Sequence, residues 1–128
     1  MVLSGGNPQQ GVFEPHIEIY QPAYLFNADG SLATRPSLTA TPTSVGYGQT
    51  FTVTTNGTIA SAVLIREGAV THAFDMSQRL VGLSFTTNGQ TVTFTGPPNG
   101  NVAPPGVYLL FLVNTNGVPS VGQVVTVQ

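Results

Sequence analysis

The chain is built from short runs in which apolar and polar residues alternate, separated by turn-forming residues. The clearest run is residues 49–55, where Phe51 and Val53 fall on one face and threonines on the other. A period of two predicts a β-strand with one buried face, because successive side chains of a strand point to opposite sides. Similar patterns predict strands at residues 16–20, 60–66, 79–86, 90–95, 106–114 and 121–127.

Turn signals between these runs complete the fold prediction. Asn-Gly pairs follow several runs, and Asn88-Gly89 between two alternating runs is the strongest hairpin signal in the chain. No segment combines a 3.6-residue period with helix caps, so we expect almost no helix. About seven short strands joined by Gly and Asn turns are typical of an all-β, immunoglobulin-like sandwich. We expect this sandwich to span residues 16–128, after a strand end and linker in residues 1–15.

The strand at residues 106–114 is the most apolar and is expected to be central. Residues 60–66 carry apolar side chains on both faces, which predicts burial on both sides of that strand.

Composition excludes several classes of protein. The net charge is -2 and there is no lysine, whereas nucleic-acid binding requires a basic face. No apolar run reaches the roughly 20 residues of a membrane-spanning helix. Charged residues are only 6% of the chain. Two explanations stay open: a secreted type of surface rich in Thr, Asn, Ser and Gly, or a surface that another domain covers.

Half of the few charged residues fall in one segment, residues 66–79. It contains two of the three arginines, two of the five carboxylates and His72. His72 is either a structural histidine or a metal ligand on a projecting loop hinged at Gly68. A single imidazole cannot hold a metal firmly, because copper and zinc sites use three or four ligands. His16, on a predicted strand, is expected to be structural.

Arg66 and Arg79 stand at the two ends of this segment. They are either solvated strand ends or braces that hydrogen-bond several carbonyls and hold the loop in one shape. We favour bracing, because the chain has so few charges.

The remaining motifs offer little chemistry. The five carboxylates are scattered, and there is neither a cysteine nucleophile nor a phosphate-binding loop. We therefore expect no turnover from the chain by itself. Asn56-Gly57-Thr58 matches the N-glycosylation acceptor pattern.

Several motifs in order resemble the C-terminal domain of galactose oxidase and glyoxal oxidase. They are Tyr20-Gln21-Pro22-Ala23-Tyr24-Leu25-Phe26, Leu32-Ala33-Thr34-Arg35-Pro36, Ile65-Arg66-x-Gly68-x-x-Thr71-His72, Gln78-Arg79, Pro104-Pro105-Gly106-Val107-Tyr108-Leu109-Leu110-Phe111 and Asn116-Gly117-Val118-Pro119-Ser120-Val121. The resemblance covers nearly the whole chain.

This resemblance implies an early-set, immunoglobulin-like domain that packs on a kelch propeller of the same polypeptide. It implies that a projecting loop carries His72 into the propeller as one ligand of a mononuclear copper, with Arg66, Gln78 and Arg79 bracing the loop. The other ligands and the radical cofactor would belong to the propeller, whose last strand would end at the Gly5-Gly6-Asn7-Pro8 turn. The parent would be a copper-radical oxidase of primary alcohols or aldehydes, located outside the cell or at its surface.

A binding module is the competing hypothesis. In it, the sandwich recognises carbohydrate or protein without catalysis. It predicts exposed aromatic side chains gathered on one surface, with Tyr20, Tyr24, Tyr47 and Tyr108 as candidates.

Overall fold

The computed structural model describes residues 2–4, 11 and 16–128, and the chain divides into two units, Met1–Ala33 and Thr34–Gln128. No helix in the described ranges is long and apolar enough to cross a membrane. The Gly5–Pro8 turn of the sequence analysis lies outside the described residues, and the boundary expected at residue 15 stays a prediction.

The first unit is small and open. Strand β1 (Val2–Ser4) pairs antiparallel with β2 (Ile17–Ile19), and a short 3-10 helix follows at Ala23–Leu25. Residues 27–30 form a turn, in which the Gly30 N–H donates to the Asn27 carbonyl at 3.0 Å. Beyond this turn, the Ser31 hydroxyl and N–H both donate to Asp29 Oδ1, and these bonds lower the pKa of Asp29.

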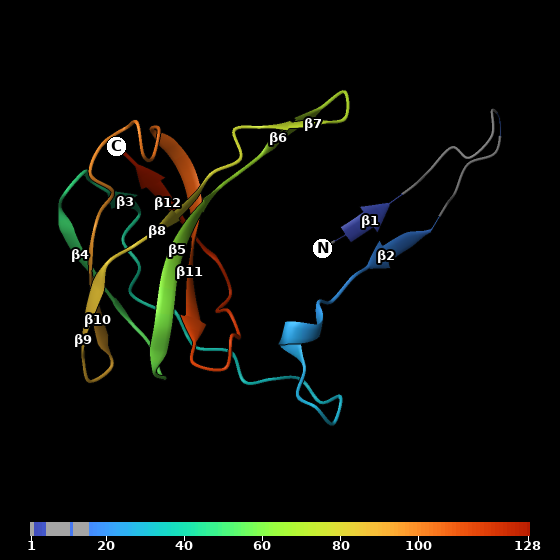
Figure 1. Ribbon diagram of the computed structural model, residues 1–128, viewed down its shortest axis with the longest axis horizontal. Coiled ribbons are helices and arrows are strands. Elements are labelled where there is room, and N and C mark those ends of the chain that lie inside the picture. The colour runs from blue at the N-terminus through green and yellow to red at the C-terminus, as the bar shows by residue number, and fades with distance from the viewer. Residues whose placement is uncertain (1, 5–10, 12–15) are drawn as a thin grey trace. The chain divides into compact units, whose positions relative to one another are not determined.

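The second unit is the predicted immunoglobulin-like sandwich (Figure 1). One sheet has the order β4 (Thr50–Thr54), β10 (Thr91–Thr95) and β9 (Phe85–Asn88). The other has the order β3 (Ser44–Val45), β12 (Gln123–Val127), β11 (Gly106–Asn114), β5 (Ile59–Arg66) and β8 (Leu80–Gly82). All neighbours are antiparallel except β3 and β12.

The core lies between the two sheets. Central strand β11 buries Tyr108, Leu110 and Leu112 completely. From the other sheet Phe94 stacks on Phe51, with ring centroids 5.0 Å apart. The Tyr108 hydroxyl donates to the Pro104 carbonyl at 2.7 Å, and burial raises the pKa of Tyr108. The predicted central position of this strand is confirmed.

Residues 79–86, predicted as one strand, form two strands in different sheets. β8 pairs with β5, whereas β9 pairs with β10. The chain crosses between them at Leu83 and Ser84. The Leu83 N–H donates to Ala62 in the five-stranded sheet, and the Ser84 carbonyl accepts from Thr95 in the three-stranded sheet. Alternation alone cannot reveal such a crossing, because every second side chain is directed to the core in both strands without a break in the pattern.

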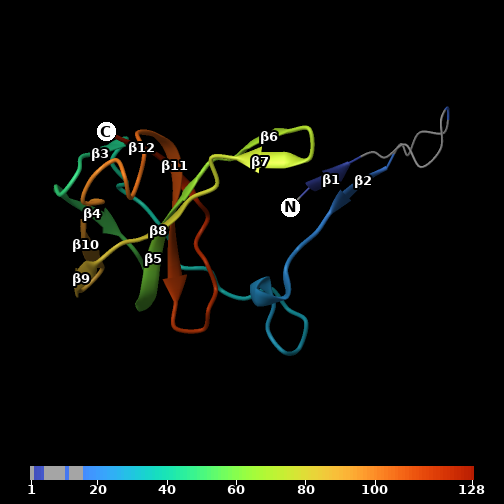
Figure 2. The same ribbon diagram turned by 45° about the horizontal axis from the view of Figure 1, so that its top comes forward.

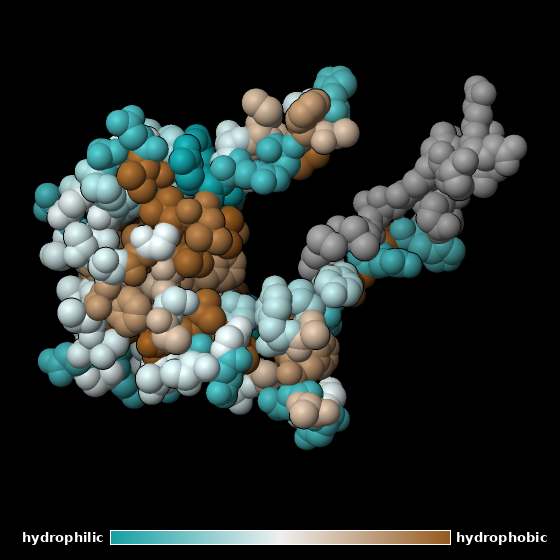
Figure 3. Space-filling view, in the orientation of Figure 1, coloured by the Kyte–Doolittle hydropathy of each residue, from teal (hydrophilic) through white to brown (hydrophobic). Residues whose placement is uncertain are grey.

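The outer face of the five-stranded sheet carries an apolar row. Leu80, Ile65, Leu109 and Val124 are paired in register across four adjacent strands. Leu80 is 66% exposed, Val124 is 60% exposed and Ile65 is 38% exposed. The burial expected on both faces of residues 60–66 is therefore incomplete in this chain, and Figure 3 shows apolar surface over β5 and β11.

Arg35 fixes the start of the second unit to the loop before β12. Its Nε donates to the Pro119 carbonyl at 2.8 Å, and its Nη2 donates to the Ser120 carbonyl. One guanidinium thereby satisfies two neighbouring carbonyls, an arrangement that a lysine could not reproduce.

Thr55, after β4, has a buried hydroxyl without a hydrogen-bond partner among the described residues. A buried hydroxyl without a hydrogen bond lowers the stability of the folded state by about 1–3 kcal/mol.

We expect Thr55→Val, which keeps the shape of the side chain, to raise the free energy of unfolding by about 1 kcal/mol in urea denaturation. Thr52→Val, at an exposed position of β4, serves as control and should change it by less than about 0.5 kcal/mol. A destabilised Thr55→Val protein would show that the hydroxyl has a partner, such as a buried water.

Candidate metal-ligating hairpin

Residues 69–76 form a hairpin that extends from the sandwich between β5 and β8 (Figures 1 and 2). Strands β6 (Ala69–Thr71) and β7 (Phe74–Met76) pair with each other, and every residue from Glu67 to Leu80 is exposed. The segment expected to be a projecting loop is thus an ordered two-stranded ribbon.

The tip of the hairpin is His72-Ala73. Thr71 pairs with Phe74, so these two residues form the whole connection, and both have positive φ, 48° and 66°. Positive φ at both central positions is the type I′ turn, whose twist suits a tight hairpin. Asn-Gly is the usual sequence for this turn, because side chains with a Cβ disfavour positive φ. The tip therefore has a histidine at a position where the backbone conformation favours asparagine or glycine.

The His72 ring has one nitrogen engaged and one open. Nδ1 lies 2.7 Å from the Thr71 hydroxyl oxygen, and Nε2 has no hydrogen bond within the described part of the chain. If Nδ1 carries the proton and donates it to Thr71, the Nε2 lone pair is available to a metal. Thr71 was part of the quoted motif, but nothing in its position along the chain indicated this contact.

The described residues do not form a complete metal site. Residues 2–4, 11 and 16–128 contain no group of three or more His, Asp or Glu side chains that could hold a metal ion. The other histidine, His16, belongs to the first unit. The His72 imidazole suits copper as a ligand, but a copper site that includes it would need further ligands from outside this chain.

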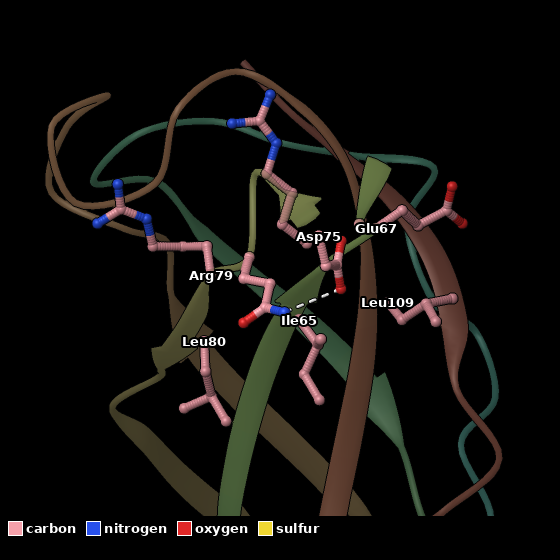
Figure 4. Close-up of a pocket in the computed structure, with 9 residues that line it drawn as sticks. Ile65, Glu67, Asp75, Arg79, Leu80 and Leu109 are labelled. Carbon is pink, nitrogen blue, oxygen red and sulfur yellow. Dashed lines mark hydrogen bonds between the residues drawn. The ribbon is translucent and has the colours of Figure 1, made fainter. Parts of the chain in front are cut away.

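At the base of the hairpin the surface forms an open hollow of about 830 Å³ (Figure 4). The Asp75 carboxylate lies against Gly68, where a Cβ would clash with Oδ1. Gln78 Nε2 donates to Asp75 Oδ2 at 3.0 Å. A side chain at residue 68 would therefore displace the exposed Asp75 carboxylate from its present position, a contact that the sequence did not indicate.

The two arginines of this segment behave differently. The Arg66 N–H donates to the Arg79 carbonyl at 2.9 Å, and Arg66 Nη2 lies 3.4 Å from the Pro105 carbonyl. The Arg79 guanidinium makes no hydrogen bond within the described ranges and extends away from Asp75 (Figure 4). The backbone bond closes the base of the hairpin, and of the two side chains only Arg66 reaches a carbonyl.

The four tyrosines do not gather on one surface of the sandwich. Tyr108 is fully buried, and Tyr47 is half-buried with its hydroxyl bonded to the Ala103 carbonyl at 2.7 Å. Tyr20 and Tyr24 are exposed but belong to the first unit. Two of the four candidates for an aromatic binding surface are thus structural.

Known proteins similar to this chain include several oxidases. The chain is 43% identical over 112 residues to a galactose oxidase of Gibberella zeae, covering 86% of this chain and 16% of that protein. It is 35% identical over 123 residues to an aldehyde oxidase of Arabidopsis thaliana, covering 86% of this chain and 20% of the relative. The chain thus spans a fifth or less of the length of these relatives.

A solved structure of a fungal alcohol oxidase, described as a novel member of the AA5 family in complex with copper, has the same fold. It superimposes with a TM-score of 0.75 and 37% identity, over 84% of this chain and 23% of that one. The family model "Galactose oxidase-like, Early set domain" matches residues 35–127, nearly all of the second unit. The chain therefore belongs to the galactose oxidase-like early set domain family.

Proposed function

We propose that this chain is the C-terminal domain of a copper-radical oxidase similar to galactose and glyoxal oxidases, and that it supplies His72 as one copper ligand. The observation that carries the proposal is the β6–β7 hairpin. It holds an exposed imidazole at its tip with Nδ1 engaged and Nε2 open. An exposed histidine at a position of positive φ, away from the core of the described residues, supports a functional role.

The surface of the hairpin supports insertion into another part of the protein. Val70 is 79% exposed, Phe74 is 70% exposed and Met76 is 57% exposed. A lone two-stranded ribbon is marginally stable in water, and exposed apolar side chains of this size favour enclosure. In our proposal a kelch propeller of the same polypeptide encloses the ribbon.

The apolar row on the outer sheet face supports the same partner. Leu80, Ile65, Leu109 and Val124 lie on the sheet from which the hairpin projects. Burying such a row would stabilise the contact by about 25 cal/mol for each Å² of apolar surface removed from water. We propose that this face packs on the propeller and places the hairpin.

The residues of this chain would position the ligand rather than react. With Nδ1 protonated, the Thr71 hydroxyl would accept a hydrogen bond from Nδ1–H, which would favour that tautomer and orient the ring. The type I′ turn fixes the backbone that carries the ring. When bound, copper would supply the redox chemistry for oxidation of an alcohol or aldehyde by oxygen. By itself the domain should have no turnover, because it holds one ligand.

Residues at the base would hold the hairpin in place. Gln78 is bonded to Asp75, and Arg66 reaches Pro105 and the Arg79 carbonyl. We propose that Arg66 and Gln78 brace the hairpin within this domain, and that Arg79, whose guanidinium makes no hydrogen bond within the described residues, braces it against the propeller.

We also propose that the protein acts outside the cell or at the cell surface. Only 6% of the residues are charged, which is consistent with a secreted type of surface. The polar surface is instead made of uncharged Thr, Asn, Ser and Gly side chains.

Loss of the His72 imidazole tests the proposal directly. In the full-length parent, His72→Ala should lower copper affinity by more than about 100-fold, because ligand loss exceeds the 10–100-fold effect of outer contacts. Copper bound per chain, measured by elemental analysis after dialysis, gives this value together with oxidase activity. His16→Ala is the matched control and should retain copper. Equal copper in the His72→Ala protein and the parent would contradict the proposal.

The Thr71 contact makes a second prediction. Thr71→Val removes the hydroxyl and keeps the shape, so copper affinity of the parent should fall by about 10-fold, whereas Thr71→Ser should restore it. The electron paramagnetic resonance spectrum of bound Cu(II) should also change in the Val protein and not in the Ser protein. Identical spectra and affinities for all three proteins would show that Thr71 does not position the ring.

The base of the hairpin makes a third prediction. In Gly68→Ala the new methyl group displaces the Asp75 carboxylate, so the hairpin should lose the same contacts as in Asp75→Ala. Both variants should speed proteolytic cleavage within residues 67–79 of this chain several-fold, because local opening governs cleavage. The double variant should be no faster than either single variant, since they remove one interaction. Additive effects would mean that the two residues act separately.

A further inference from the structure

The turn between β4 and β5 carries a motif that the proposed function leaves unused. Asn56, Gly57 and Thr58 are all exposed, and the residues on either side, Thr55 and Ile59, are buried. The acceptor pattern Asn-x-Thr occurs at this place alone in the sequence. The motif therefore stands on the surface in a turn that is anchored at both ends.

The Asn56 side chain has a defined orientation. The Ser37 N–H donates to Asn56 Oδ1 at 2.7 Å, and because an N–H can only donate, this bond fixes which end of the amide is oxygen. Nδ2 makes no hydrogen bond within the described residues. A sugar on Nδ2 would leave Oδ1 and its bond to Ser37 intact, so the folded turn tolerates the modification.

A hollow of about 300 Å³ adjoins this amide, between the β4–β5 turn and the β9–β10 turn. Asn56 and Thr58 line one side, Thr87 and Gln90 line the other, and Phe85 is half-buried among them. The first sugar of an N-glycan has an apolar ring face that suits an aromatic side chain, and hydroxyl and acetamido groups that suit the polar rim.

The site lies away from the metal-ligating hairpin. Asn56 precedes the first residue of β5, whereas the hairpin follows its last residue, and eight strand residues span about 26 Å. A glycan at the β4–β5 turn would therefore leave the hairpin free to enter a partner domain.

We propose that Asn56 carries an N-linked glycan whose first N-acetylglucosamine rests in this hollow. Nδ2 loses one proton and bonds to the anomeric carbon of a polyisoprenyl-diphosphate-linked oligosaccharide, and the carbon–oxygen bond to the diphosphate breaks. The polyisoprenyl diphosphate leaves with the electron pair, without oxidation or reduction. The transfer requires passage through a eukaryotic secretory pathway, so it rests on the proposed extracellular location, and it is independent of copper.

The test is secretion of this chain from a yeast host behind an added signal peptide, followed by peptide mass spectrometry. The peptide with Asn56 should carry a glycan that an amidase releases, leaving an aspartate at that position. Thr58→Ser should stay modified, whereas Thr58→Ala and Asn56→Gln should be unmodified. Secreted chain with an unmodified Asn56 peptide would overturn the proposal, whatever the outcome for copper.

The hollow is tested by trimming the glycan. Chain that keeps a single N-acetylglucosamine should melt about 2–4 °C higher than unmodified chain made in a bacterial host, which retains Asn56. Thr87→Ala with Gln90→Ala, both at exposed positions, should reduce this difference. An equal melting temperature for the trimmed and the unmodified chains would show that the sugar does not occupy the hollow.

Discussion

The pairing of β5 with β11 is the contact on which the rest of the domain depends. Its register places Leu64 opposite Leu110 on the core side and Ile65 opposite Leu109 on the outer side. A shift by one residue would exchange the two faces, turning the core side chains outward. The same pairing brings Arg66 beside Tyr108 at the end of the strands and so sets the point from which the hairpin leaves the sheet.

The sequence predicted the sandwich well because its signals are local. Alternation in residues 49–55 and 90–95 matches β4 and β10, and the hairpin between β9 and β10 forms where Asn88-Gly89 predicted it. The two-residue turn is Gly89-Gln90, because Asn88 pairs with Thr91, and Gly89 alone supplies the positive φ. The strand β3 was not predicted, because two residues carry no period and its partner β12 lies far along the chain.

The candidate site was predictable only in part. The cluster of charges and the family motif singled out His72 and the arginines. The strand pairing of residues 69–76 had no such signal, since Ala-Val-Thr and Phe-Asp-Met are too short and the His-Ala turn lacks glycine. Likewise, Asp75 and Gly68 are seven residues apart in the sequence. They come into contact only through the register in which β6 pairs with β7.

The bond from the Arg66 N–H to the Arg79 carbonyl has a consequence for how this domain can change. It joins two adjacent strands of the sheet directly below the hairpin, so residues 67–78 form an insertion on a closed loop. Most mutations in residues 67–78 would change the surface of the hairpin without changing whether the sandwich folds. Lineages could shorten, lengthen or replace the hairpin while the sandwich stays the same, and a copy that lost the hairpin would remain a folded domain.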